Sequence, residues 1–563
     1  MRQPDPDATV ILPVVPEADP DATQLLPTVP AAPRAQEKSI GRSSAAMALG
    51  SLVSRATGFL RTMLITAALG SAVGNAYTNA TLFPGMVYEL LLGGVLSSVL
   101  VPLIIRARDS DDDRGEAYTQ RLLTGSVLFL AAATVLAVAC APLLARAVAD
   151  PANVELTTRW AYLILPTIFF YGLAALFAAV LNTRGSFAAP MWAPILNNLV
   201  ICLAATLVIV LLNSKPTLID VPDWVVLVLG LGTALGIVVQ AVSLIPALRK
   251  VGFRWRWRFD LRALRLREIG RLGGWMVCYV LVSQIGVIVV NKLANFSGAQ
   301  GEAGSLIYNN VYLLMMMAHG IIAVSILTAL MPRMSTSAAA GRYADVAADL
   351  SRGTRLVIVM LAPVSVLYLV LNVPIAITLF KLNNFTTSDA LATGVVMAGA
   401  AFALIPFAVS QLQTFAFYAM PDTRTPALIN IPVVAVRCLV SIGFKVLLPV
   451  GILGFGLMIG NAVSFLLAAA LCGWLLRKRL GPLGSRDIAI TSGKVLAAAV
   501  AAAIPGFLLV FLMDPADGGK LYNILVLALG GAVIGGVYLA VAHVLRITEV
   551  TEAIGMVRRK LGR

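Results

Sequence analysis

The sequence predicts an all-α polytopic membrane protein with about 14 transmembrane helices. Hydrophobic residues make up 59% of the 563 positions and charged residues only 13%, and the mean hydropathy is +0.87. A soluble core of this size does not need so much apolar sequence, so the bilayer is the expected solvent. Apolar runs of about 20 residues, enough helix to cross ~30 Å of hydrocarbon, recur between short polar joints. Helices are expected because lipid offers no partner for an unpaired backbone amide.

Charge counts orient these runs. The predicted spans are approximately 44–69, 77–105, 122–148, 160–181, 190–212, 224–248, 271–296, 305–331, 355–380, 390–419, 426–448, 452–476, 491–513 and 522–545. The two tails and the joints on their side hold 33 Lys and Arg residues, against 5 in the opposite joints. Both termini are therefore predicted to lie in the cytoplasm, with the protein in the bacterial inner membrane. Because these cations are spread between spans, the net charge of +15 does not predict nucleic-acid binding.

Repeated blocks divide the spans into two groups. The stretch 181–184 leads to Pro190 at the joint of spans four and five, and the stretch 421–426 leads to Pro432 at the joint of spans ten and eleven. The copies are six spans apart, and since six is even they share one orientation. This arrangement is typical of a rocking transporter with its site between two parallel lobes. The predicted parts are a disordered cytoplasmic tail (1–42), an N-terminal six-helix lobe (43–248), an amphipathic interfacial linker (249–270), a C-terminal six-helix lobe (271–480), two additional transmembrane helices (481–548) and a basic cytoplasmic tail (549–563).

The linker is the largest basic joint. Arginine alternates with Trp and Phe over residues 254–259. This pattern suits a segment in the headgroup layer, with its rings at the interface and its guanidinium groups on anionic lipid.

The N-terminal tail contains a repeat. Asp7-Ala8-Thr9 recurs as Asp21-Ala22-Thr23, and each copy is followed by a Leu-Pro pair. One interpretation is low-complexity drift. The other is that Thr9 and Thr23 are phosphorylated by a Ser/Thr kinase and are then bound by an Arg-lined phosphothreonine reader such as an FHA domain.

Sequence motifs for soluble chemistry are missing. The chain has no GxxxxGK[ST], HExxH or GxSxG motif and no dense acidic metal site, so no enzymatic activity, metal or other cofactor is predicted. The five cysteines all lie in apolar runs without paired spacing, as expected of small buried residues.

Charges inside spans are the candidate functional residues, because they are costly in lipid and tend to face a cavity. Arg55 and Arg61 lie on span one, where two arginine forks can flank one cavity and bind diphosphate oxygens. Arg61 can alternatively anchor at the interface. Glu89, at a depth near that of Arg55, either neutralises Arg55 or lines the cavity independently.

Three further candidates carry a charge or an imidazole. Arg437 lies near the middle of span eleven and is a cavity-lining candidate. Lys292, near the outer end of span seven, either lines the cavity or anchors at the interface. His319 is either a hydrogen-bonded packing residue or a proton relay.

Several motifs together resemble the MurJ/MviN family of lipid II flippases. They are Ser54-Arg55 with Gly58-Phe59-Leu60-Arg61, Ala68-Leu69-Gly70, Phe83-Pro84, Gly93-Gly94-Val95 with Val101-Pro102, Asn182-Thr183-Arg184 with Pro190, Pro194 and Asn197-Asn198, Ser283-Gln284, and Tyr418 with Asp422 and Thr425-Pro426. The resemblance covers about 44–545. It implies a 14-helix member of the MOP exporter superfamily that carries the undecaprenyl-diphosphate-linked peptidoglycan precursor outward by alternating access, with Arg55 and Arg61 at the diphosphate.

The chain departs from that family pattern at several positions. Many relatives carry an acidic residue where this chain has Asn75, a basic residue near Tyr88 and Glu89, and an Arg and a Glu near Leu313 and Met316. Asn75 is therefore included among the cavity-lining candidates. The tail threonines and the Ala/Val-rich composition resemble an actinobacterial branch of the family.

Three functions are weighed. The first is a lipid II flippase acting in peptidoglycan synthesis, with lipid II and membrane lipids as partners and no nucleic acid. The second is a cation-coupled multidrug exporter, or an exporter of another lipid-linked oligosaccharide, from the same superfamily. The third is a scaffold for cell-wall synthesis that does not transport and is recruited through the tail.

Overall fold

The computed structural model describes residues 34–89, 104–105, 107–108, 113, 115–212, 215–260, 266–516 and 518–551, with side chains of the first and of the tenth helix described from residues 49 and 274. The described helices are α1 (Arg34–Glu89), α3 (Glu116–Ala139), α4 (Ala141–Val148), η2 (Pro151–Asn153), α5 (Val154–Ile164), α6 (Thr167–Thr183), α7 (Ala188–Leu211), α8 (Asp223–Ser243), α9 (Ile245–Lys250), α10 (Leu266–Gly298), α11 (Ser305–Ala339), α12 (Tyr343–Val370), α13 (Asn372–Phe380), α14 (Thr387–Ala419), α15 (Arg424–Leu447), η4 (Val450–Ile452), α16 (Leu453–Leu480), α17 (Ser485–Met513) and α18 (Lys520–Val544). We call α1–α9 the N-terminal half and α10–α18 the C-terminal half. Within the described ranges no strand occurs, and the predicted all-α fold class is confirmed.

Most of these helices are long and apolar enough to cross a bilayer. Twelve meet that description, and a thirteenth is added when the pair α5 and α6, bent by 43°, is counted as one span. The chain is thus a multi-pass membrane protein. The predicted count of fourteen is not confirmed, and the second predicted span, 77–105, lies partly outside the described residues.

Helix α1 differs from the prediction at its start and in its middle. It begins at Arg34, inside the segment assigned to the disordered tail, because Ala, Gln, Glu and Lys are good helix formers that extend the span towards its start. Gly70 then interrupts the helix with φ 68° and separates the residues of the first predicted span from those of the second. A Cβ at this position would lie 2.9 Å from the Asn384 carbonyl oxygen, so both the turn and the close approach require glycine.

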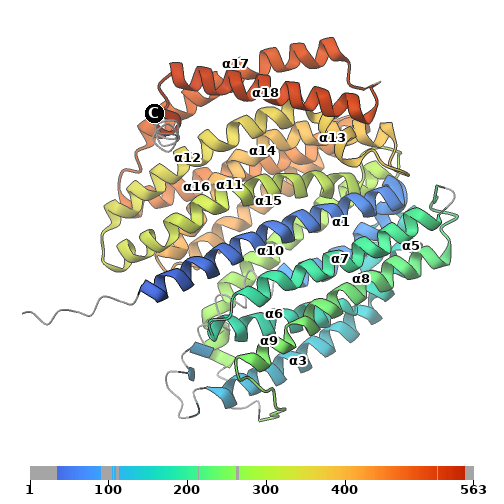
Figure 1. Cartoon of the computed structure of the whole chain (residues 1–563), viewed down its shortest axis with the longest axis vertical. Coiled ribbons are helices and arrows are strands. Elements are labelled where there is room, and N and C mark those ends of the chain that lie inside the picture. Colours follow the sequence, from blue (N-terminus) through green and yellow to red (C-terminus); the bar gives the residue numbers. More distant parts are fainter. Residues whose placement is uncertain are drawn as a thin grey trace, which may run out of the picture.

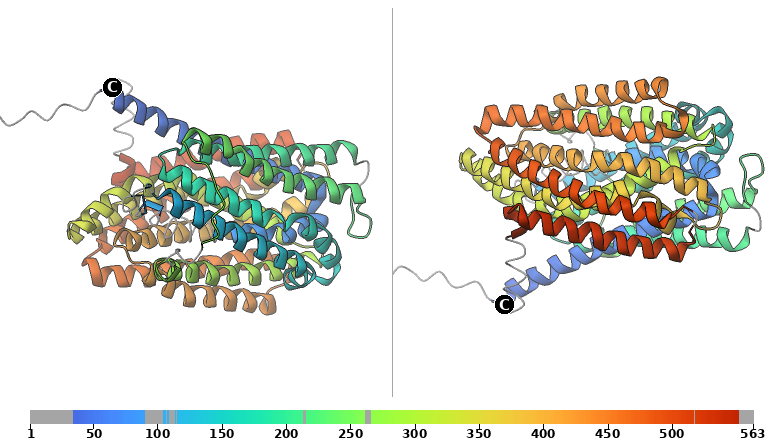
Figure 2. Two further views of the ribbon diagram at one scale, coloured as in Figure 1. Left: turned by 90° about the horizontal axis from the view of Figure 1, so that it is seen from below. Right: turned by 90° about the horizontal axis from the view of Figure 1, so that it is seen from above.

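The helices run side by side along one long axis (Figure 1). The start of α1 and the end of α18 lie at one end of the molecule, and α5 and α13 lie towards the opposite end. Helices α17 and α18 pack on each other and on α12 and α13, and they form an outer pair (Figures 1 and 2). The first part of α1 packs along α7, and α10 and α11 lie beside α1 in the middle of the molecule.

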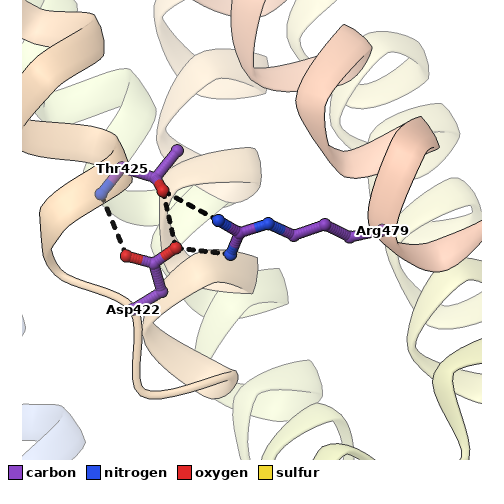
Figure 3. Close-up of polar contacts among 3 residues, drawn as sticks. All are labelled: Asp422, Thr425 and Arg479. Carbon is purple, nitrogen blue, oxygen red and sulfur yellow. Dashed lines mark hydrogen bonds and ion pairs between the residues drawn. The ribbon is translucent and has the colours of Figure 1, made fainter.

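We call one end of the molecule the basic end. It carries the joints α6–α7, α9–α10, α11–α12, α14–α15 and α16–α17. Arg184 and Arg342 lie in these joints, and Arg249, Arg424 and Arg477 lie in the helix turns next to them. The α14–α15 joint is held there by three side chains (Figure 3). Asp422 accepts hydrogen bonds from the backbone and hydroxyl of Thr425, at 2.9 and 2.6 Å, and pairs with the guanidinium of Arg479 in α16. Burial raises the pKa of the Asp422 carboxyl, but the hydrogen bonds from Thr425 and Arg479 outweigh it, so the pKa lies below its ordinary value.

The corresponding joint of the N-terminal half is held by a different contact. The Arg184 guanidinium lies 4.9 Å from the ring centre of Phe253 and donates a hydrogen bond to the Val251 carbonyl at 3.1 Å. In the C-terminal half, the Asp422 carboxylate therefore ties the α14–α15 joint to the end of α16. In the N-terminal half, the Arg184 guanidinium ties the α6–α7 joint to the segment after α9.

Candidate functional site

A central cavity of about 710 Å³ is lined by residues of both halves. The N-terminal half contributes residues of α1, α6, α7 and α8, and the C-terminal half contributes residues of α10, α11, α14, α15 and α16. Its charged lining residues are Arg61, Glu89 and Arg437. The wall is otherwise made of aromatic, amide and hydroxyl side chains, among them Tyr77, Tyr88, Tyr171, Tyr279, Tyr308, Tyr312, Ser283, Gln284, Asn291, Asn309, Asn310, Gln411, Asn430 and Ser464.

Arg61 is oriented by an amide of α7. Its Nη1 donates to the Asn198 side-chain oxygen at 3.1 Å, and the Asn198 amide nitrogen in turn donates to the Ser54 carbonyl and the Thr57 hydroxyl, both at 3.1 Å. Asn198 is 5% exposed. Because its amide is fixed by α1 backbone and side chain, it limits the positions open to the Arg61 guanidinium.

Arg55 lies elsewhere than predicted. It lines a second cavity of about 380 Å³ within the N-terminal half, formed with residues of α6, α7 and α8. Its guanidinium contacts the backbone of Gly320 in α11, where a side chain would collide with it. The prediction placed both arginines on one cavity, but six residues of helix turn them about 120° apart, and they line separate cavities that share Tyr88.

Glu89 faces the C-terminal half. Its carboxylate lines the central cavity and accepts a hydrogen bond from the Gln284 amide of α10 at 3.0 Å. Among the described side chains, no ion pair joins it to Arg55. Of the two interpretations made from the sequence, the geometry favours the one in which Glu89 lines the cavity independently.

Arg437 brings a second guanidinium to the central cavity, from α15. Its Nη2 lies 3.5 Å from the Tyr308 hydroxyl, which also accepts a bond from Asn461 at 2.7 Å. Its Nε is buried and has no hydrogen-bond partner. The guanidinium therefore retains donors for a ligand.

The remaining candidates lie outside the central cavity's lining. Lys292 is exposed, and its Nζ lies 3.5 Å from the Arg146 carbonyl. His319 packs edge-on against Phe407, with ring centres 4.7 Å apart, and its Nδ1 is buried without a hydrogen-bond partner. Thr9 and Thr23 lie outside the described residues. Among the described side chains, no group of three or more His, Cys, Asp and Glu could hold a metal ion.

Asn75 belongs to a contact between the halves at the end opposite the basic joints. Its side-chain oxygen accepts from the Leu306 backbone N–H at 2.9 Å, and it is 2% exposed. It thereby satisfies one of the free N–H groups at the start of α11.

Other amides join the halves at the same end. Asn295 donates to the Asn79 side chain at 2.8 Å and to the Val148 carbonyl at 2.9 Å, and Asn384 donates to the Ala68 carbonyl at 2.8 Å. We call Asn75, Asn79, Asn295 and Asn384 the amide seal. The central cavity lies between this seal and the contact of Arg55 with α11.

Sequence reasoning missed most of the amides. Asn198 and Gln284 entered only as parts of family motifs, and Asn79, Asn295, Asn309, Asn310 and Asn384 did not enter at all. A signal was available, because amides within apolar runs must find partners inside the protein.

The chain is similar to known proteins over most of its length. The family model "Lipid II flippase MurJ" matches residues 65–527, which is more than half of the chain. A lipid II flippase MurJ of Burkholderia cenocepacia is 28% identical over 420 residues, covering 73% of this chain and 78% of the relative. A probable lipid II flippase MurJ of Haemophilus influenzae is 26% identical over 479 residues, covering 80% and 89%.

Solved structures share the fold. A lipid II flippase MurJ in an inward closed conformation matches with a TM-score of 0.71 at 18% identity, over 89% of this chain and 98% of the other. An inward-facing multidrug resistance MATE family transporter of the MOP superfamily matches with a TM-score of 0.63 at 15% identity, over 77% and 96%.

Proposed function

The chain belongs to the MurJ family of lipid II flippases, and from this we propose that it moves lipid II, the undecaprenyl-diphosphate-linked peptidoglycan precursor, from the inner to the outer leaflet. Such a step requires a polar cavity that opens to either side in turn, because the polar head cannot cross hydrocarbon unaided. The proposed mechanism is alternating access, with the two halves rocking around the central cavity. The substrate is carried and not chemically changed, so no catalytic residue is assigned.

The observation that carries this proposal is the pair of arginines in the central cavity. Arg61 and Arg437 come from different halves, so an anion bound to both would join the halves. A guanidinium presents a planar fork that matches phosphate oxygens, and inside a membrane its field is screened less than in water. The neighbouring amides and hydroxyls suit the polar head of a lipid-linked oligosaccharide.

We also propose the orientation. With the basic end in the cytoplasm and the amide seal at the outer face, the many joint cations obey the charge rule for inner-membrane proteins. In the same scheme each half contributes six spans and α17–α18 are the two additional helices. Cysteines placed singly in the α11–α12 joint and in the α13–α14 joint, and labelled from one side of the membrane, test this orientation.

Transport itself is tested by depletion. In a strain without another flippase, depletion should reduce lipid II on the outer face, and the wild-type chain should restore it. Arg61→Ala and Arg437→Ala should each lower the restored exposure, whereas Lys215→Ala, which changes an exposed joint residue, should not. Unchanged lipid II exposure after depletion would reject the proposed function.

A cation-coupled multidrug exporter is the alternative suggested by the fold shared with the MATE transporter. The cavity charges argue against it, since two arginines and one glutamate line the wall where a cationic drug would bind. Ligand-induced stabilisation separates the two functions. A ligand at 100 times its Kd should add about 2.7 kcal/mol to the free energy of unfolding. Lipid II should do so, and a lipophilic cation should not.

For the N-terminal tail we propose phosphorylation of Thr9 and Thr23 and binding of an FHA-type reader, because acidic residues precede each threonine. A reader bound to these threonines would bring wall-synthesis partners to the membrane without disturbing the helices. The double variant Thr9→Ala, Thr23→Ala should insert and transport but lose a cytoplasmic partner in a pull-down. Finding no phosphate on either threonine, or the same partners in the double variant, would reject this proposal and would mean that the repeat is low-complexity spacer sequence.

A further inference from the structure

A third cavity, of about 540 Å³, lies at the basic end beneath the segment that follows α9. Figure 1 shows α9 at this end, beside α6 and near α3. Its apolar wall is formed by Phe177, Ile245, Leu248, Phe253 and Trp255. Arg249 and Arg254 complete the lining, and both are exposed. An apolar pocket edged by two guanidinium groups suits an amphiphile with an anionic head.

A third donor belongs to a residue of the same lining, Trp255. The indole Nε1 of Trp255 is buried and has no hydrogen-bond partner. An indole N–H only donates, so the group that satisfies it must be an acceptor, as phosphate and ester oxygens are. The orphan donor and the two guanidinium groups therefore call for the same kind of ligand.

The segment is held in place before any ligand binds. At its start, Arg184 contacts Phe253 and the Val251 carbonyl. Further along, the Gln120 amide donates to the Arg254 carbonyl at 3.1 Å, and the Arg258 Nε donates to the Gln120 oxygen at 2.8 Å. Fixing the segment on α3 reduces the entropy lost on binding.

The outer face of the segment that follows α9 is aromatic. The rings of Trp255 and Trp257 are 4.6 Å apart, and those of Trp257 and Phe259 are 6.0 Å apart and stacked. Trp257 is 55% exposed and Phe259 68%. Exposed aromatic rings beside arginines, just after the last residue of a membrane span, are typical of the headgroup layer.

We propose that this cavity binds an anionic phospholipid, with the phosphate between Arg249, Arg254 and the Trp255 indole N–H, and with an acyl chain against Phe177 and Leu248. This site is separate from the central cavity and does not depend on the transported substrate. It would tie the connection between the two halves to the membrane surface.

Native mass spectrometry of the purified full-length protein, titrated with phosphatidylglycerol or phosphatidylcholine, tests the site. We expect tighter binding of phosphatidylglycerol. Each arginine near a charged membrane surface contributes about a fivefold change in affinity, so Arg249→Gln with Arg254→Gln should weaken binding roughly 25-fold. Trp255→Phe keeps the ring, removes the donor and should weaken binding about fivefold.

Arg256→Gln is the matched control, because Arg256 lies on the same segment but does not line the cavity. It should change the affinity less than twofold, and thermal unfolding should show that all variants fold. Equal weakening by Arg256→Gln and Arg254→Gln would mean a diffuse charged surface and would overturn the proposal. So would equal affinity of the wild-type protein for the two lipids.

Discussion

The two ends of the contact between the halves are closed by different chemistry. At one end the amide seal joins the halves through buried neutral hydrogen bonds, such as those of Asn75 and Asn295. Towards the basic end, the contacts between the halves use charged groups, namely Arg55 against α11 and Glu89 with Gln284. A charged ligand can compete for the second set and not for the first. The difference teaches that the charge of a substrate can act directly on the contacts towards the basic end, and not on the amide seal.

The largest expected effect comes from removing the charged contact. Arg55→Ala should abolish growth of a depleted strain while the protein still inserts, because its guanidinium is the charged group that joins α1 to α11 towards the basic end, and losing such a group costs about 2–5 kcal/mol. The rate of lipid II exposure should fall at least about 30-fold.

Lys215→Ala is the control for Arg55→Ala, since it removes a cation from an exposed joint. Full growth with Arg55→Ala would show that the charge on this side of the cavity is dispensable, and the comparison between the two ends would fail.

An intermediate effect is expected at the amide seal. Asn75→Ala leaves the Leu306 N–H buried without an acceptor, which costs about 1–3 kcal/mol and should open this end at least fivefold more often. The opening can be measured with a membrane-impermeant thiol reagent on Asn309→Cys, which lines the cavity, in a chain whose five natural cysteines are replaced.

Asn75→Asp keeps the acceptor oxygen and serves as the matched variant. It should label more slowly than Asn75→Ala. If the two label at the wild-type rate, Asn75 does not hold this end closed.

The smallest effect is expected for a charge at the basic end that lies outside the contact between the halves. Asp422→Asn should lower the free energy of unfolding by about 1 kcal/mol, because the pair with Arg479 is partly exposed, and should leave transport unchanged. Thermal unfolding and lipid II exposure measure the two quantities. A transport defect as large as that of Arg55→Ala would show that any charge at the basic end matters.

The same pair has a defined pH dependence. The folded-state pKa of Asp422 lies below its ordinary value of 3.8, so the stabilisation is fully present above about pH 3.8 and is lost as the pH falls through the lower, folded-state pKa. Asp422→Asn should remove this dependence. A destabilisation by Asp422→Asn that grows between pH 6 and 8 would contradict this assignment.

The fold could be predicted because each helix that crosses the bilayer must be a long, continuous apolar run. Lengths of about 20 residues and the distribution of Lys and Arg were sufficient to place helices such as α7, α8 and α15 within a few residues. Breaks were harder to predict. The bend between α5 and α6 and the turn at Gly70 depend on local packing, which hydropathy does not record.

The site could be predicted only in part, for geometric reasons. A charge inside a span is expensive in lipid, and this rule found Arg61, Glu89 and Arg437, which line the central cavity. The same rule could not tell that Arg55 points to α11, because helix rotation and side-chain direction depend on neighbours. Asn75 was included for its departure from a family pattern, and it is a contact between the halves that does not line the cavity.

The amide seal also sets how the closed state responds to its surroundings. In the proposed orientation these carboxamides lie on the outer side of the membrane, where acidity and salinity change more than they do in the cytoplasm. A carboxamide neither titrates in the physiological range nor loses attraction to dissolved ions, as an exposed ion pair does. We therefore expect the contacts of the amide seal to keep their strength when external pH and salt change, and the charged contacts towards the basic end to respond to them.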